Sequence, residues 1–198
     1  EVGQVTNMYR MFQNASSFNQ DVSNWNTSAV TDMRSMFDGA SSFNGKISSW
    51  DTSAVTDMSR MFREASSFNQ GDLSNWDTSA VTSMRSMFYG ALAFDDNISS
   101  WNTSAVTDMG WMFREASKFN QDLSAWNTSA VLNMSAMFYG ASAFNGDISS
   151  WDTSEVTDMC YMFSDALSFN QGDLSNWDTS AVTKMYAMFY KAIAFNDD

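Results

Sequence analysis

The sequence predicts an α/β fold, a single-domain repeat solenoid of eight coils of about 25 residues, each with one short parallel strand and one short helix. Three observations predict it. One segment recurs along the whole chain, apolar residues at the start of each copy have helical spacing, and a short β-type segment in each copy finishes at a tryptophan. Repeats of this size bury their apolar faces by stacking on one another.

The repeat is anchored by the pattern Val-(Thr)-x-Met, and its copies fill residues 1–198 without a proline or a linker. Copies have 25 residues, but those starting at Val55 and Val156 have 26 because each carries an added glycine, Gly71 or Gly172. One added glycine predicts a bulge or wider turn. Neither end resembles a polar cap, so we expect a fragment of a longer chain. The copies start at Val5, Val30, Val55, Val81, Val106, Val131, Val156 and Val182.

A second period doubles the first. Odd-numbered copies continue with Phe-Asn-Gln-(Gly)-Asp-[Val/Leu]-Ser-x-Trp, whereas the second, fourth and sixth end in Ile-Ser-Ser-Trp. The structural unit is therefore a pair of copies.

Apolar residues in the first half of each copy predict an amphipathic helix of about three turns. In the second copy they recur at i, i+3, i+6, i+7 and i+10, as Val30, Met33, Met36, Phe37 and Ala40. Thr27 and Ser28 stand where an N-cap is expected, and Asp32 would lie in the first turn. Gly39 stands where a helix stop is expected.

The second half of each copy predicts a polar turn and then a strand, Ile47–Trp50 in the second copy. Such a strand is too short to stand alone and would stack in parallel with its copies. The Met, Phe and Trp columns predict the core, where each indole N–H needs an acceptor. A column of asparagines is expected to hydrogen-bond turn backbone from one coil to the next. Its members are Asn19, Asn44, Asn69, Asp95, Asn120, Asn145, Asn170 and Asn196.

Composition excludes several classes of function. A net charge of −13 argues against nucleic acid as a partner, because binding to phosphates needs clustered lysine and arginine. No apolar run reaches the length of a membrane span, so we expect no membrane insertion. Histidine is absent and Cys160 is the only cysteine, which removes the commonest general base and most transition-metal sites. We therefore expect no enzymatic activity, no catalytic residues and no cofactor.

The signature M-F-x-x-A-S-S-F-N-Q-D-L-S-x-W-D-T-S-x-V-T-D-M appears nearly verbatim from Met11 to Met33 and from Met61 to Met84. It resembles the DUF285 repeat of BspA-like leucine-rich-repeat surface proteins. The resemblance covers all eight copies and implies a leucine-rich-repeat-like solenoid in a secreted or cell-surface protein with a role in adhesion or interaction. It implies no catalytic residues.

Two polar features favour structural roles and leave functional ones open. One Asp/Asn column offers weak calcium ligands, Asp51, Asp77, Asp152 and Asp178, but a column that recurs in every coil favours turn capping or a side-chain ladder. In the same column, Asn102 and Asn127 satisfy the Asn-x-Thr/Ser pattern for glycosylation. A metal site is otherwise not expected.

Function is predicted at the positions that vary between copies. The ninth residue of successive copies reads Arg63, Tyr89, Arg114 and Tyr139, and Trp111 lies at a nearby outward position. These residues could stabilise the stack laterally through cation–π contacts, or contact a partner, because Tyr, Trp and Arg are enriched at interfaces.

We therefore expect an extracellular or cell-surface module for adhesion or protein recognition, whose partner is a protein or a cell-surface glycan. An alternative is a building block of a filament, sheath or surface layer through self-association. A more distant alternative is binding to glycan, ice or mineral through the Thr, Ser and Asp columns.

Overall fold

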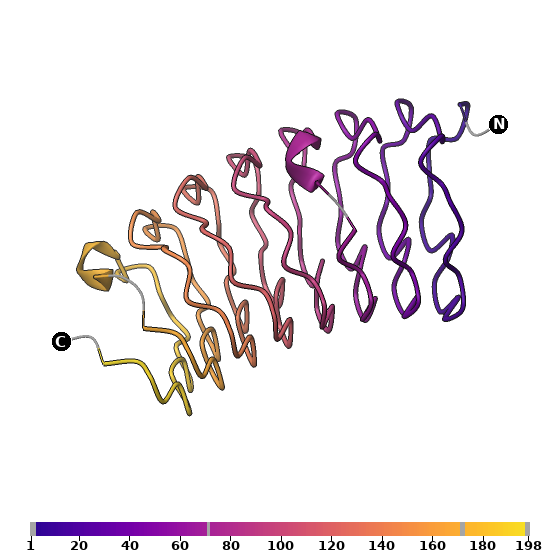
Figure 1. Ribbon diagram of the computed structural model, residues 1–198. Helices are drawn as coiled ribbons and strands as arrows, with labels where there is room; N and C mark the ends of the chain where they lie inside the picture. The colour runs from indigo at the N-terminus through magenta and orange to yellow at the C-terminus, as the bar shows by residue number, and fades with distance from the viewer. Residues whose placement is uncertain (1–2, 71, 171–172, 197–198) are drawn as a thin grey trace.

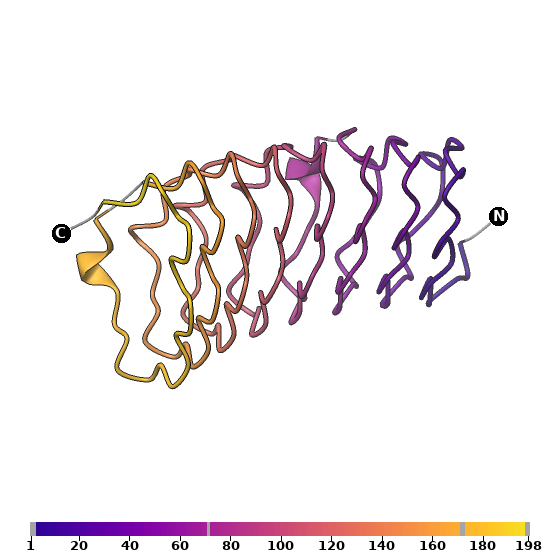
Figure 2. The same cartoon turned by 90° about the horizontal axis from the view of Figure 1, so that it is seen from below.

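The computed structural model describes residues 3–70, 72–170 and 173–196. The chain winds into coils that stack along one axis, with the two termini at opposite ends of the stack (Figures 1 and 2). We number the coils one to eight in chain order, from the copy that starts at Val5 to the copy that starts at Val182.

The predicted α/β composition of the coils is wrong. Among the described residues there is no α-helix and no β-strand, and the only regular elements are two 3₁₀ turns, η1 (Leu73–Asn75) and η2 (Leu174–Asn176). Neighbouring coils are joined by single parallel β-bridges, which do not extend into strands. The bridged pairs are Asn7–Asp32, Asp32–Asp57, Asp57–Ser83, Ser83–Asp108, Asp108–Asn133, Asn133–Asp158 and Asp158–Lys184.

Tandem turns replace the predicted helix. The amide N–H of Met36 donates to the carbonyl of Met33 and that of Ala40 to Phe37, so hydrogen bonds close tight four-residue turns. The alternate amides, those of Phe37 and Gly39, donate to the next coil. An α-helix cannot form because half of the amides bond to the neighbouring coil instead of running back along the chain.

Positive φ angles recur in these turns and interrupt the helix. The third residue of each of two successive turns has φ above zero, Ser35 at 54° and Gly39 at 72°. A positive φ at this position is the mark of a type II turn. The helix stop predicted at Gly39 is therefore a turn residue.

The segment predicted as a strand, Ile47–Trp50, is also a turn, since the amide of Trp50 donates to the carbonyl of Ile47 at 3.1 Å. The hydroxyl of Thr27, predicted to cap a helix, donates to the carbonyl of Asp51 in the next coil at 2.9 Å. Both predictions failed for one reason. The backbone groups are satisfied by short turns and by neighbouring coils.

The two 3₁₀ turns occur only in coils three and seven, the 26-residue copies. Each is capped by an aspartate that accepts from the second residue of the turn, Asp72 from Ser74 and Asp173 from Ser175. The bulge predicted at Gly71 and Gly172 lies outside the described residues.

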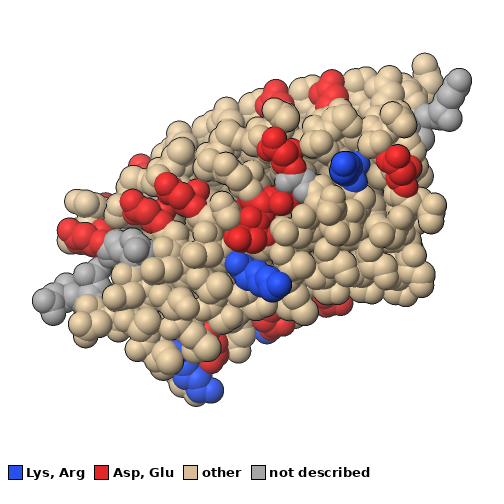
Figure 3. Space-filling view, viewed as in Figure 1, with Lys and Arg blue, Asp and Glu red and all other residues tan. Residues whose placement is uncertain are grey.

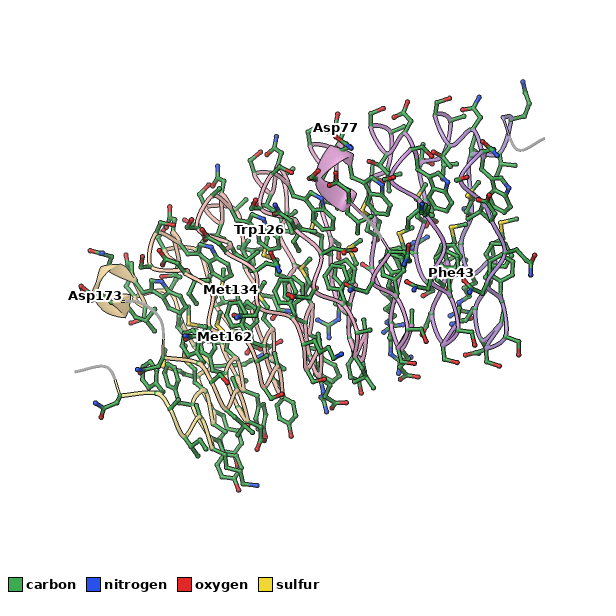
Figure 4. All side chains as sticks on the ribbon, in the orientation of Figure 1. Phe43, Asp77, Trp126, Met134, Met162 and Asp173 are labelled. Atoms are coloured by element: carbon green, nitrogen blue, oxygen red, sulfur yellow. The ribbon has the colours of Figure 1, made fainter. Side chains whose placement is uncertain are left out.

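The predicted core is confirmed. Met, Phe, Val, Ala and Trp columns form one buried cluster along the stack, and Figure 4 shows Phe43, Trp126, Met134 and Met162 among the coils. Phenylalanine rings of successive coils stack face to face, for example Phe88 on Phe113 with centroids 5.8 Å apart.

Polar columns tie one coil to the next, as predicted. The indole N–H of Trp101 donates to the carbonyl of Leu73 at 2.9 Å, and the other tryptophans from coil two to coil seven make equivalent bonds. In the asparagine column, the amide N–H of Asn44 donates to Oδ1 of Asn19 at 2.9 Å, a pattern that continues to Asn196. The columns therefore satisfy polar groups that stacking would otherwise bury.

Candidate functional site

The variable residues predicted to be neighbours do meet on the outer surface. We call Arg63, Tyr89, Trp111, Arg114 and Tyr139 the stripe. The guanidinium of Arg63 lies over the ring of Tyr89 at 5.2 Å, and that of Arg114 lies over Tyr89 at 5.2 Å and Tyr139 at 4.5 Å. Arginine and aromatic residues thus alternate along four successive coils.

Trp111 joins the stripe from the sixth position of coil five. Its ring lies 4.8 Å from the guanidinium of Arg114 and meets the ring of Tyr89 edge-on at 6.2 Å. Arg85, whose guanidinium lies over the ring of Trp111 at 5.7 Å, was not predicted as a member of the stripe. Arg85 is the fifth residue of its copy, and that position also varies between copies, which is the signal that could have found it.

Two adjoining depressions lie along the stripe. One, of about 390 Å³, is lined by Arg60 and Trp111 with Ser86 in the coil between them. The other, of about 530 Å³, is lined by Trp111 and Tyr161 with Ala136 in the coil between them. A third, of about 230 Å³, is lined by Arg60 and by Ser35 of coil two. We call the three depressions the groove.

The first two depressions are basic and aromatic although the chain is acidic. Four of the six arginines of the sequence line them, and none of their described lining residues is Asp or Glu. Aromatic rings come from Tyr89, Trp111, Tyr139 and Tyr161. The third depression includes one carboxylate, Asp57.

Carboxylates flank the groove and hold the arginines. Asp108 accepts from Nη1 of Arg85 at 3.4 Å, and Glu115 accepts from Nε of Arg114 at 3.1 Å. These side chains are partly exposed, so each pair stabilises the fold by about 1 kcal/mol or less. A guanidinium has five N–H donors, so one such bond leaves several for a ligand.

The residues that form the walls of the groove have a left-handed backbone conformation. At the sixth position of the copies, φ is 59° at Arg60, 64° at Trp111 and 58° at Tyr161. The intervening coils hold small residues in the same conformation, Ser86 at 56° and Ala136 at 50°. Residues other than glycine pay about 1–3 kcal/mol for this conformation, and it is a true outlier for bulky ones.

The weak calcium candidates lie on a different column from the groove, and Figure 4 shows Asp77 at the edge of its coil. Oδ1 of Asp51 accepts from the amide of Ser53 at 3.0 Å, and Asp77 accepts from Ser79 at 2.9 Å. Hydrogen bonds from these serines, hydroxyl first and then amide, lower the pKa of both carboxyls.

Asp152 and Asp178 make the same turn, which is the predicted capping role. Among the described residues no three Asp, Glu, Cys or His side chains gather as a metal site would need. Acidic side chains are spread over the face drawn in Figure 3, with only isolated basic ones.

The glycosylation candidates belong to this column too. Asn102 and Asn127 are exposed, and Oδ1 of each accepts from the serine amide two residues later at 3.1 Å.

Within the described part of the chain, no helix is long and apolar enough to cross a membrane.

Comparisons with known proteins give one family. The family model described as "Mycoplasma protein of unknown function, DUF285" matches residues 1–72, 70–150 and 124–198. A search of curated proteins found no match.

Proposed function

Since this chain belongs to the DUF285 family, whose model matches it from end to end, we propose that it is a non-catalytic recognition module of a secreted or cell-surface protein. The resemblance of its repeat to BspA-like surface proteins supports this placement outside the cell. The groove is its contact surface, and the partner is a protein.

The observation that carries the proposal is the separation of two kinds of column. Columns that build the coil are nearly invariant between copies, whereas the fifth, sixth and ninth positions vary and bring Arg, Trp and Tyr together in one groove. Residues of these three types dominate the binding energy of protein interfaces. Cation–π contacts within the stripe hold the side chains in place, which lowers the entropy that binding costs.

The experiment is a selection from a random peptide display library on the immobilised chain. A triple variant, R85S/W111S/R114S, serves for counter-selection. Each serine already occurs at the equivalent position of another coil, as Ser59, Ser86 and Ser164, so the coil should fold.

We expect enriched peptides that bind the wild-type chain at least tenfold more tightly than the triple variant. The matched control is D77N/D152N, which changes residues of the calcium-candidate column, outside the groove, to the asparagine found in coils four and five and should keep full binding. Enrichment of nothing, or of peptides that bind the wild-type chain and the triple variant equally, would contradict the proposal.

A further inference from the structure

The groove has a period of two coils, which its lining residues fix. Three of its walls are the bulky sixth residues Arg60, Trp111 and Tyr161 of odd-numbered coils, and Tyr9, the fifth residue of coil one, lines the third depression on its other side. Its floors are the small sixth residues Ser35, Ser86 and Ala136. Coils joined by parallel bridges are about 4.8 Å apart, so successive depressions recur about every 10 Å.

From this period we propose that the groove binds a polypeptide segment in the polyproline II conformation, with every third side chain entering successive depressions. Polyproline II has three residues per turn and rises about 3.1 Å per residue, so residues i and i+3 lie on one face about 9.3 Å apart. A β-strand places side chains of one face only about 6.8 Å apart and falls out of register. The inference rests on the proposed function and names the partner for the same site.

The lining predicts which side chains enter. The depression between Arg60 and Trp111 contains Arg63 and Arg85 as well. Both of these arginines already pair with carboxylates, but none of those carboxylates is among the described lining, and the five N–H donors of each guanidinium leave some for a glutamate or aspartate of the ligand. The depression at Ser35 adds Arg34 and suits a second acidic side chain, but more weakly, because Asp57 lines it and Arg34 already donates two hydrogen bonds to Asp32. The depression between Trp111 and Tyr161 also includes Arg85 and Arg114, but aromatic rings form its walls, so it suits proline or leucine packed against those rings.

The occupant is thus an acidic, proline-rich segment whose side chains read acidic, acidic, apolar at intervals of three residues. The arginines that line the groove complement an acidic segment locally, and a second copy of this chain cannot supply a proline-rich segment because the sequence contains no proline. A proline-rich ligand is already extended before it binds, so it loses little entropy.

The test is isothermal titration calorimetry of the whole chain with synthetic peptides. PPEPPEPPLP places its acidic and apolar residues at intervals of three, and PPEPEPPPLP has the same composition with the interval broken. The reversed sequence PLPPEPPEPP covers the second orientation, since polyproline II ligands have near-symmetric backbones. PPKPPKPPLP reverses the charge.

We expect PPEPPEPPLP or its reversed sequence to bind at least tenfold more tightly than both controls, and more weakly as salt concentration rises. R60S should weaken binding of the glutamate peptide, and W111S should weaken it too. W111S should also remove the preference for PPEPPEPPLP over PPEPPEPPSP, a fifth peptide in which serine replaces the leucine. D77N/D152N should leave affinity unchanged.

Other outcomes overturn the inference. Equal binding of PPEPPEPPLP and PPEPEPPPLP would refute the three-residue register. Tighter binding of a heparin oligosaccharide or of a single-stranded oligothymidine would assign the groove to an acidic glycan or to nucleic acid. If the display selection yields groove-dependent peptides without this pattern, the inference fails and the proposed function stands. If it yields none, both fail.

Discussion

Coils one, three, five and seven share their interior with coils two, four and six, but the two sets differ at the outer turns. Phe113 of coil five and Phe88 of coil four are equally buried and stack on each other. At the sixth position, however, coil five has Trp111 where coil four has Ser86. At the tenth position, odd coils have Asn14, Glu64, Glu115 and Asp165, whereas even coils have Gly39, Gly90 and Gly140.

Both sets of coils therefore adopt the same backbone conformation at these turns, whereas the side chains exposed there differ between the sets. Glu64 at φ 56° and Gly90 at φ 68° hold the same turn, although only glycine adopts this conformation without steric cost. The turns of odd-numbered coils are therefore strained where they carry large or charged side chains. The small sixth residues of even-numbered coils form the floors of the depressions between them.

The largest expected loss of stability should be the same in odd-numbered and even-numbered coils. Phe113→Ala and Phe88→Ala each remove a fully buried ring and leave a cavity, and each should lower the free energy of unfolding by about 3–5 kcal/mol. Chemical denaturation of both variants measures it. A difference of more than about 2 kcal/mol between them would mean that the interiors of odd and even coils are not equivalent.

A smaller loss of stability should occur in even-numbered but not in odd-numbered coils when the tenth residue is changed to alanine. Gly90→Ala adds a Cβ at positive φ that would meet Cγ of Glu64 at 3.3 Å, so we expect it to destabilise the chain by about 1–2 kcal/mol. Glu64→Ala keeps an L-residue in the same conformation and should change stability by less than about 0.5 kcal/mol. Equal losses in thermal melts of the two variants would show that strain is not what distinguishes the positions.

The sixth position should affect binding more than stability. Trp111→Ser gives coil five the residue of coil four and removes contacts with Arg85, Arg114 and Tyr89. Exposed cation–π contacts contribute about 0.5–1 kcal/mol each, so the free energy of unfolding should fall by about 1–2 kcal/mol at most. A loss near that of Phe113→Ala would assign Trp111 to lateral stabilisation of the stack instead of to a partner.

The smallest expected effect is on the pH dependence of stability, and it arises at an aspartate–serine turn that occurs in both sets of coils. Hydrogen bonds from Ser53 and Ser79 lower the pKa values of Asp51 in coil two and Asp77 in coil three. The unfolded pKa of aspartate is about 3.9, so the charged carboxylates contribute fully above it. This contribution is lost as pH falls through the lower pKa of the folded state.

Thermal melts between about pH 6 and pH 2 should show this loss. D51N/D77N should flatten the acid dependence, because asparagine makes the same turn at Asn102 and Asn127 without titrating. D51N and D77N taken singly should act alike. An unchanged pH profile in the double variant would show that other carboxylates govern the acid response.

Core columns and the neighbours in the stripe could be predicted because each depends on side-chain spacing. Val30, Met33, Met36 and Phe37 are buried together, as a helix would bury them. Their spacing cannot reveal that the amide of Ser35 donates to Ser59 of the next coil, because that bond depends on how closely coils approach. Two tandem type II turns and one amphipathic helix leave the same apolar pattern.

The depressions could not be predicted for a related reason. Trp111 and Arg60 face each other across Ser86, two coils apart, and Arg85 reaches Trp111 from a different position of the coil between them; the left-handed backbone at the sixth residue sets where these side chains project. Left-handed conformation at Arg, Trp or Tyr has no sequence signal, because these residues disfavour it.

The alternation of bulky and small sixth residues bears on how such genes change length. Unequal crossing-over between near-identical repeats can remove one copy or two without disturbing contacts between residues about 25 positions apart. Loss of two successive copies preserves the alternation of bulky and small sixth residues, and so keeps the remaining depressions. Loss of the copy that holds Ser86 would instead set Arg60 directly beside Trp111 and erase a depression. Selection for recognition would therefore show itself in populations as length variants that differ by even numbers of copies.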